Sequence, residues 1–484
     1  MSKVFQELDC EETDGVEDIE TPFDTFLRPK YKKSLAYRIF KHKIPVLLDQ
    51  IIDSLNQNKD EILKAHSVEV IDDIKQVVEG IKNLKTELIA NKPLVPLKPI
   101  NHRKYDDAKL WNTQLENLSK VQNEKLTWFN AIFFISESYL YRRLAQEFFL
   151  TKHLKNYDPF SLLKHEMYFE ALQNISLLCE HMMLLLSKNC DVADLECDFI
   201  NLLRLNLWGN RSDLYLLARG LTSHGSAKDL LESLNKNILI DDSKRVWKLI
   251  LQKFKCENKS IVIDVVLDNS GYELFTDICL AAFFVKRKLA SKIRFYVKCY
   301  PWFISDVLTN DFHWLIDTMT KSDDKNIQSF GTFCNGCLEN GSWAIEVNFC
   351  KLKIFIRSLK TKNFPLQEES FWTEPFDYAD MKSIRPSLYN KLSVSILVII
   401  KGDLNYSKLM GDINWKYVTN FKQALRGFQP TNLVCLRTIK SDICVGLPAG
   451  KVEELKMDDS KWMYKGQFGL IQAFTDYNGE NEKY

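Results

Sequence analysis

The sequence lacks an excess of charge of either sign. Its 484 residues include 65 Lys and Arg against 64 Asp and Glu, so the formal net charge is +1. With so little net charge, no overall field draws the chain to nucleic acid or to an anionic membrane surface. We therefore expect no nucleic-acid partner and no membrane partner, and any charged ligand must be bound by a local site.

Long hydrophobic runs are also lacking. The longest, residues 261–267 and 393–400, fall far short of the roughly twenty apolar residues that span a bilayer, and are typical of buried strands. Residues 1–20 are strongly acidic, whereas a signal peptide begins with a basic region followed by an apolar one. We therefore predict a flexible acidic tail, no signal peptide, and a cytoplasmic or nuclear location.

No cysteine framework is evident. The twelve cysteines are scattered, and in a chain without a secretion signal we expect them to be reduced and buried. Cys334 and Cys337 form a CxxC pair, but a structural zinc site needs a second pair of ligands, and His313 is the only nearby histidine. An ordinary loop is therefore favoured over a zinc site.

What the sequence does contain is 45% hydrophobic residues, enough for a large core. A basic run at residues 28–43 favours a solvated helix face over a nucleic-acid patch. Apolar residues then recur at three- and four-residue spacing, which is typical of amphipathic helices. Five segments show this period: residues 44–55, 68–84, 127–150, 169–186 and 193–207. We predict a helical domain over residues 21–245, interrupted by an extended connector at Pro93, Pro96 and Pro99 because proline does not fit a helix interior.

From residue 246 the pattern changes to short, β-branched apolar runs that end abruptly in polar residues. The runs lie within residues 261–271, 292–302, 343–349, 394–405 and 432–442. Continuous apolar strands with helices between them imply a mostly parallel sheet covered on both faces. The predicted fold class is α/β, with the N-terminal helical domain followed by a mostly parallel, Rossmann-like α/β/α sheet domain over residues 246–484.

Polar clusters follow the predicted strands, where open α/β sheets bind their ligands. Taken singly, each cluster can have a purely structural role. The DNSG sequence at 268–271 is more often a turn and helix cap, and residues 401–403 resemble a tight turn. Taken together, two carboxylates and an amide suit a hard cation, and two lysines suit an oxyanion. This combination is typical of a metal-dependent phosphate site.

Three of these segments resemble the damage-control phosphatase family. They are DNSGYELFTD (268–277), KGDLNYSKLMGDINW (401–415) and LRTIKSDICVGL (436–447), the last containing the Arg-Thr-x-Lys motif that marks one subfamily. Animal members of that subfamily are also called acidic residue methyltransferases. The resemblance extends to residues 34–53, 208–214 and 301–307, and so covers most of the chain outside the acidic tail.

This resemblance implies a metal-dependent phosphatase, a phosphoric monoester hydrolase acting on small phosphorylated metabolites. The implied substrates are sugar phosphates such as fructose 1-phosphate and fructose 6-phosphate, and the implied ion is Mn, Co, Ni or Mg. It also implies a claimed second activity, methyl transfer from S-adenosylmethionine to glutamate side chains of proteins. Protein substrates would be partners only for that second activity.

The family's functional residues carry over to matching positions of this sequence. The implied metal ligands are Asp268, Asn269 and Asp306, all oxygen donors, which agrees with an octahedral ion and not with tetrahedral zinc. The implied catalytic residues are Asp268, Asp306 and Asp403. The implied S-adenosylmethionine contacts are Glu273 and Asp306. The implied substrate-binding residues are Asp268, Asn269, Lys401, Gly402, Asp403, Leu404, Asn405 and Lys440.

The mechanism that these residues favour is attack by a metal-activated water, with Asp403 as a candidate acid or base. A phospho-aspartyl route through Asp268 is less favoured, because the dehalogenase-type phosphatases need a second Asp two residues later and this chain has Ser270. Lys401 and Lys440 would stabilise charge on the transferring phosphoryl group.

Two other classes of function remain as alternatives. A protein-glutamate O-methyltransferase would need a methyl-donor pocket, yet the turn after the first strand has one glycine where three are usual, and Glu273 is equally explained as a helix first-turn glutamate. A non-catalytic helical interaction protein would leave the strand-end cluster without a purpose. Residues 446–451 do not form a P-loop, because only three residues separate the glycines and Val452 replaces Ser or Thr.

Overall fold

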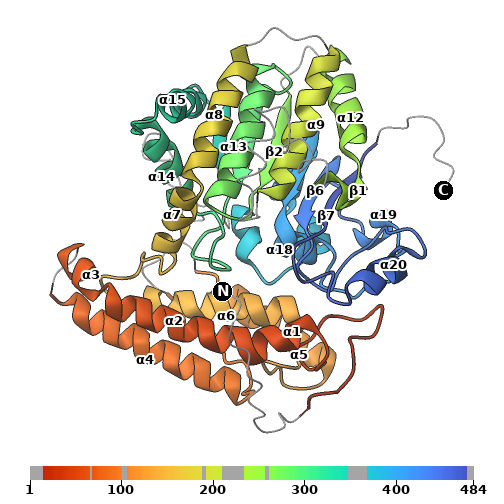
Figure 1. Cartoon of the computed structure of the whole chain (residues 1–484). Helices are drawn as coiled ribbons and strands as arrows, with labels where there is room; N and C mark the ends of the chain where they lie inside the picture. Colours follow the sequence, from red (N-terminus) through yellow and green to blue (C-terminus); the bar gives the residue numbers. More distant parts are fainter. Residues whose placement is uncertain are drawn as a thin grey trace, which may run out of the picture. The chain divides into compact units, whose positions relative to one another are not determined.

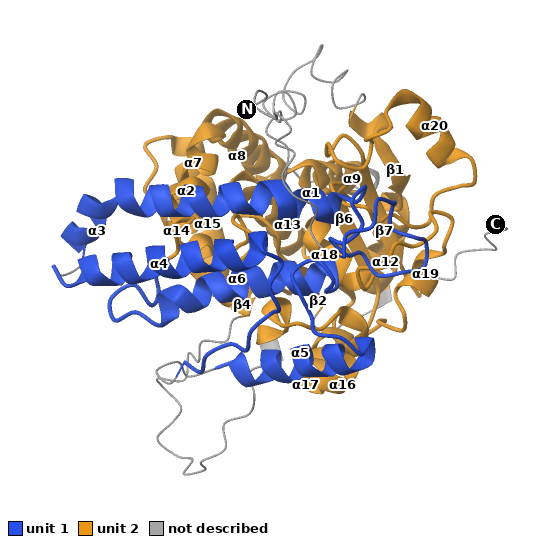
Figure 2. Cartoon of the chain, turned by 90° about the horizontal axis from the view of Figure 1, so that it is seen from below, with its two compact units in different colours: residues 1–157 blue, residues 158–484 orange. Residues whose placement is uncertain are grey.

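The computed structural model describes residues 15–65, 68–100, 106–187, 192–209, 234–256, 261–346 and 368–476. The chain divides into two compact units, residues 1–157 and 158–484 (Figure 2). This division comes earlier than the predicted domain boundary at residue 245. The reason is that helices between the two positions share the hydrophobic core of the sheet.

Unit 1 is helical, as the sequence predicts for its part of the chain. Its main helices α2, α4 and α6 pack side by side (Figure 1). Of the predicted acidic tail, residues 1–14 lie outside the described part, and Glu17 is hydrogen bonded to the backbone of Lys30. The α-helices of this unit are α1 (Leu35–Arg38), α2 (Ile44–Gln57), α3 (Lys59–Ala65), α4 (Val70–Ile89), α5 (Ala108–Gln122) and α6 (Phe133–Phe149).

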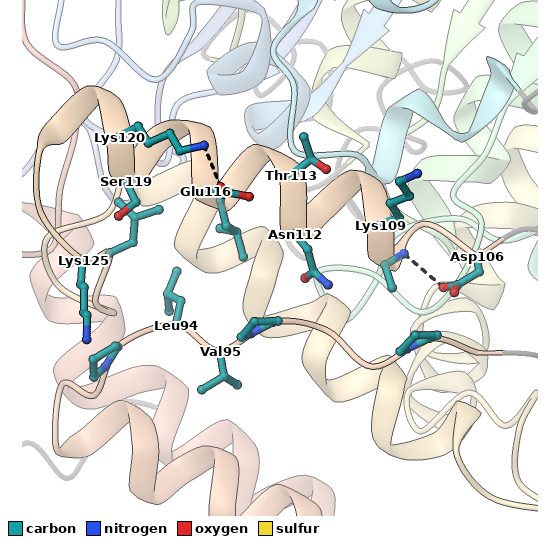
Figure 3. Close-up of a pocket in the computed structure, with 16 residues that line it drawn as sticks. Leu94, Val95, Asp106, Lys109, Asn112, Thr113, Glu116, Ser119, Lys120 and Lys125 are labelled. Atoms are coloured by element: carbon teal, nitrogen blue, oxygen red, sulfur yellow. Dashed lines mark hydrogen bonds and ion pairs between the residues drawn. The ribbon is translucent and has the colours of Figure 1, made fainter.

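The three prolines lie in an extended segment between α4 and α5, which confirms the predicted connector. An open pocket of about 870 Å³ lies between this connector and α5 (Figure 3). Leu94 and Val95 line it from the connector, and the Glu116–Lys120 ion pair, at 2.7 Å, lies on α5. None of the predicted site residues lines this pocket.

Unit 2 contains a seven-stranded sheet in the order β1-β7-β6-β5-β2-β3-β4. Of the strand pairs formed by the described residues, only β6–β7 is antiparallel, which confirms a mostly parallel sheet. The strands are β1 (Ile238–Asp241), β2 (Val262–Val266), β3 (Lys292–Tyr296), β4 (Trp343–Glu346), β5 (Leu397–Lys401), β6 (Leu433–Thr438) and β7 (Gly469–Phe474).

Five of these strands lie in the predicted runs, whereas β1 and β7 were not predicted. The edge strand β1 has four residues, none of them fully buried, so it carries no long apolar run. In β7 the apolar run is interrupted by Gln472, whose side-chain oxygen accepts a hydrogen bond from Tyr406 at 2.9 Å. The apolar segments on either side of Gln472 are short, so they give a weaker strand signal than the run of β5.

Alternate strand residues face opposite sides of the sheet, because successive side chains of a strand point in opposite directions. One face, including Ile263, Val265 and Phe295, packs in a single core with α8, α9, α12 and α13 (Figure 1). On the other face, Tyr296 packs against Trp372, with ring centroids 5.2 Å apart. The sheet is therefore covered on both faces, as the apolar runs predict.

The helices of unit 2 alternate with the strands. The α-helices are α7 (Ser161–Glu170), α8 (Leu172–Ser187), α9 (Val192–Trp208), α12 (Ser243–Cys256), α13 (Tyr272–Lys286), α14 (Thr309–Thr320), α15 (Lys325–Glu339), α16 (Met381–Ile384), α17 (Pro386–Ser393), α18 (Gly402–Leu409), α19 (Phe421–Ala424) and α20 (Lys451–Asp458). Among the described residues, no helix combines the length and apolar character needed to cross a membrane.

The loop predicted for the CxxC pair is wrong. Cys334 and Cys337 lie in helix α15, where both are buried, because a spacing of three places them on the same helical face. Within the described ranges, no group of three or more His, Cys, Asp or Glu side chains is arranged to hold a metal ion. The pair therefore belongs to the core.

Candidate active site

The loops after β2 and β3 are hydrogen bonded to each other at the carboxyl edge of the sheet. Asn269 and Asp306 form a two-residue antiparallel bridge. The backbone N–H of Val307 donates to the carbonyl of Asp268 at 2.9 Å, and that of Ser270 donates to the carbonyl of Ser305 at 2.7 Å. These bonds bring together the three predicted metal ligands.

Three buried carboxylates lie close together here, those of Asp268, Asp306 and Glu273. Burial raises the pKa of Asp268 well above its usual range, and the charges of Glu273 and Asp306 raise it further. Burial also raises the pKa of Asp306 to about 6. Repulsion among buried carboxylates is what a bound cation would relieve.

The donor set predicted for a hard cation consists of two carboxylates and one amide, and so differs from the groups of three or more His, Cys, Asp or Glu that are absent from the described residues. Asp306 Oδ2 is inaccessible and accepts no hydrogen bond of good geometry, although Lys298 Nζ lies 3.1 Å away. Asn269 Nδ2 donates to Asp268 Oδ2 at 2.7 Å and to Glu273 Oε2 at 2.8 Å, while its oxygen accepts from the Ser305 hydroxyl at 2.5 Å. Because a hydroxyl can also accept, a rotation of this amide would turn its oxygen toward the carboxylates. Two carboxylates and one amide oxygen are ligands that Mg²⁺ or Mn²⁺ prefers.

The Lys401 ammonium is engaged by side chains of α9 and α13. It is buried and lies 3.0 Å from Asp277 and 3.4 Å from Glu273, and it donates to the side-chain oxygen of Asn206 at 2.7 Å. Burial alone would lower the pKa of Lys401, but the two carboxylates outweigh burial and raise it. Burial raises the pKa of Asp277 to about 6. This side chain therefore neutralises the α13 carboxylates from inside the fold.

Gly402 allows helix α18 to begin directly beside Asp268. Its φ is +82°, and a Cβ atom added here would lie 1.8 Å from Asp268 Oδ2. Asn405 holds the turn, since its Nδ2 donates to the carbonyls of Lys401 at 2.8 Å and Leu267 at 3.2 Å. The side chain of the N-cap residue, Lys401, makes no capping hydrogen bond to α18 within the described part of the chain. The first backbone N–H groups of α18 are therefore the kind of donors that bind phosphate.

The Arg-Thr-x-Lys motif, at the end of β6, is bonded to the first turn of α18. Arg437 is completely buried, and its Nε donates to Asp403 Oδ1 at 2.6 Å while its guanidinium lies 4.2 Å from the ring centroid of Tyr406. The backbone N–H of Lys440 donates to the same Asp403 oxygen at 3.2 Å. The motif arginine thus fixes Asp403 and, through it, the backbone at Lys440. Leu404 is half-buried in the same turn.

Several polar residues of this site were not predicted. Asp277 lies four residues after Glu273 on α13, so the helical period could have identified it. Lys298 lies two residues after β3, within the predicted run of residues 292–302, and no local pattern distinguishes it from other lysines. Asn206 lies in a helix that the sequence assigns to another domain, and nothing local marks it.

A further buried lysine, Lys408, lies on α18. Its Nζ donates to the carbonyls of Phe371 at 2.5 Å and Glu374 at 3.1 Å. Burial lowers the pKa of Lys408 to about 7, and the positive charge of Lys298 contributes to the decrease. An unfolded lysine keeps its proton up to a pKa of about 10.4.

Because the unfolded chain binds this proton more tightly, stability is expected to rise with pH above 7. The slope from this one group approaches about 1.4 kcal/mol per pH unit between its folded and unfolded pKa values. Lys408→Met should remove that slope, whereas the lost hydrogen bonds should lower stability equally at every pH. Urea denaturation of both proteins at pH 7 and pH 9 measures the difference. Equal slopes in the two proteins would contradict a depressed pKa at Lys408.

The fold and site define a class of protein, an α/β protein in which buried carboxylates and the N-terminus of a helix meet at the carboxyl edge of a parallel sheet, where proteins of this class bind their ligands. Residues 39–455 match the family described as the damage-control phosphatase ARMT1-like domain. The damage-control phosphatase ARMT1 of Mus musculus is 35% identical over 458 residues, which cover 92% of this chain and 98% of that protein. The proteins of the same name from Danio rerio and Homo sapiens are 33% identical over 454 and 447 residues, covering 92% and 91% of this chain and 96% of each relative.

The chain therefore belongs to the damage-control phosphatase ARMT1-like family and is a phosphatase of metabolite damage control. This confirms the resemblance found in the sequence. Of the segment at 208–214 that contributed to the resemblance, only Trp208 and Gly209 lie within the described residues.

Proposed function

We propose that this chain hydrolyses phosphate monoesters of small sugars, such as fructose 1-phosphate and fructose 6-phosphate, with the help of a bound Mn, Co, Ni or Mg ion. The observation that carries the proposal is that the buried carboxylates of Asp268 and Asp306 and the half-buried amide of Asn269 meet beside the N-terminus of α18. A cation site and a phosphate site that adjoin in this way are what monoester hydrolysis requires.

Asp268, Asn269 and Asp306 would hold the cation, which when bound supplies Lewis-acid polarisation of the phosphate and a more acidic water. The backbone N–H groups at the start of α18 would bind phosphate oxygens, with Gly402 allowing the close approach. The backbone of Lys401 would form part of this phosphate-binding turn, whereas its ammonium forms ion pairs with the α13 carboxylates Glu273 and Asp277. Lys440, whose backbone N–H is bonded to Asp403, would add a positive charge.

Asp403 is held in one orientation by Arg437 and by the backbone of Lys440. This fixed carboxylate would position the reacting water or the leaving group, which is the acid or base role predicted for it. A preorganised group of this kind contributes because it does not have to reorient during the reaction.

No observation among the described residues favours methyl transfer as a second function. The carboxylate predicted to contact S-adenosylmethionine, that of Glu273, is already engaged by Asn269 and Lys401. The roles predicted for Glu273 and Asp306 toward a methyl donor stay predictions.

The test is a panel of phosphorylated metabolites assayed with purified protein and each of the four ions. We expect phosphate release from fructose 1-phosphate and fructose 6-phosphate that disappears on chelation, with slower release from nucleoside monophosphates. A radiolabelled methyl-transfer assay on the same preparation should show no labelled protein ester. Methyl transfer without phosphate release from any compound would contradict the proposal and support the alternative activity.

A further inference from the structure

Lys298 is a buried cation that the family resemblance does not assign. It lies just beyond β3, and its side chain is 2% exposed. Its Nζ lies 3.1 Å from Asp306 Oδ2 and donates to the carbonyl of Leu267 at 3.3 Å. Its backbone N–H donates to the carbonyl of Val307 at 2.9 Å. The lysine is therefore fixed by both its backbone and its ammonium to the segment that carries Asp306.

The charges around Lys298 form one connected group, which we call the charge cluster. Asn269 donates hydrogen bonds to two of its carboxylates, those of Asp268 and Glu273. Lys401 lies within ion-pair distance of Glu273 and Asp277. Asp306, which pairs with Lys298, is joined to Asn269 by the backbone bridge between the loops after β2 and β3. The cluster consists of the carboxylates of Asp268, Glu273, Asp277 and Asp306 and the ammonium groups of Lys298 and Lys401.

With every member ionised, four carboxylates and two ammonium groups give the charge cluster a formal charge of −2. One divalent cation neutralises that charge. Lys164 also acts on Asp306 from a distance, but its ammonium contacts Asp158 at 2.9 Å and Asp311 at 2.8 Å, outside the cluster. Without Lys298 the cluster would carry −3, and one divalent ion would leave it negative.

We propose that Lys298 is a positioning residue of this site, which holds the Asp306 carboxylate and balances the cluster so that one divalent cation makes it neutral and able to accept a phosphate dianion. The inference rests on the proposed function, because it concerns the same cation and the same phosphate. Lys298 acts through Asp306 and through its charge, and is not placed against the reacting atoms.

This role predicts opposite effects on two ligands. A positive charge beside a ligand carboxylate repels the metal ion and attracts the phosphate, and in a buried site both effects are strong. Removing the charge should therefore tighten metal binding and weaken phosphate binding together. A residue that served only the packing of the loop would weaken both when removed.

The experiment compares wild type, Lys298→Met and Lys298→Arg. Calorimetric titration of the metal-free proteins with Mn²⁺ should show about tenfold tighter binding by Lys298→Met, and Lys298→Arg should restore wild-type affinity. The Mn²⁺-induced rise in melting temperature should also be larger in Lys298→Met, because its Asp306 carboxylate is buried without a partner until the ion binds. With Mn²⁺ saturating, KM for the sugar phosphate should rise several-fold.

Lys391→Met is the matched control, since Lys391 forms an ion pair of 2.8 Å with Glu346 outside the charge cluster. It should leave Mn²⁺ affinity unchanged. Weaker Mn²⁺ binding by Lys298→Met, or unchanged binding, would overturn the inference. A wild-type protein that binds Mn²⁺ but hydrolyses no phosphate monoester would instead refute the proposed function. The Mn²⁺ titrations of the variants would still decide the role of Lys298 in balancing the site's charge.

Discussion

Replacing Asp306 with asparagine is expected to remove nearly all cation-dependent phosphatase activity. The substitution keeps the shape and one oxygen donor but deletes a charge from the proposed metal ligands. The expected loss in kcat/KM is more than about 100-fold. Substitution of residues that only hydrogen bond to metal ligands usually causes a smaller loss than this. Metal affinity should fall in parallel, measured by calorimetric titration with Mn²⁺.

Asp306→Asn also removes the carboxylate that forms the ion pair with the buried Lys298 ammonium, so the metal-free variant should be less stable than wild type. Circular dichroism establishes that it remains folded before its activity is compared. The control is Asp317→Asn, which changes an exposed carboxylate on the helix that follows Asp306. If Asp306→Asn retained wild-type metal affinity and rate, Asp306 would be withdrawn from the site.

Gly402→Ala is expected to have the second largest effect, a loss of activity of about 100-fold or more in a protein that still folds. The new Cβ would lie 1.8 Å from Asp268 Oδ2. That carboxylate is buried and held by Asn269, so relieving the clash displaces either a proposed metal ligand or the start of α18. Misplacement of a catalytic group by about 1 Å is enough for a loss of this size. Steady-state kinetics with saturating Mn²⁺ measures it.

Gly427→Ala separates backbone strain from the clash. Gly427 has a similar φ of +92°, but no atom lies within 4 Å of an added Cβ. Both substitutions force alanine into the left-handed region at a cost of about 1–2 kcal/mol, so both should lower the free energy of unfolding. Only Gly402→Ala should lose activity. Equal activities in the two variants would show that the approach of Gly402 to Asp268 has no catalytic importance.

The sequence predicts the parts of this fold whose burial is continuous. The runs at β2 and β5 are buried on both faces of the sheet, so both consist mainly of apolar, often β-branched residues; the one charged residue of β2, Asp264, is paired with Arg294 of β3 at 2.6 Å. Strand β7 is interrupted by Gln472, and β1 is short and lies at an edge, so neither produces the same signal. The helical period gives the helices correctly but not the unit to which each belongs, because an amphipathic face does not specify its partner.

Within the site, residues in short motifs were predictable and residues that act through tertiary contacts were not. Asp268 and Gly402 stand next to strand ends, where parallel sheets place their ligands. The side chain of Lys401 was expected at the phosphate, yet it is held by Asn206 and Asp277, which come from two helices far apart in sequence. No local pattern encodes such a contact.

The most direct test of the account is a titration of exhaustively chelated protein with Mn²⁺, following bound metal and phosphate release from fructose 1-phosphate in the same samples. The site described here predicts no activity without metal, a rate that rises in proportion to bound ion, and saturation at one ion per chain, as the charge of the cluster requires. Full activity in protein that contains no metal by elemental analysis would contradict it.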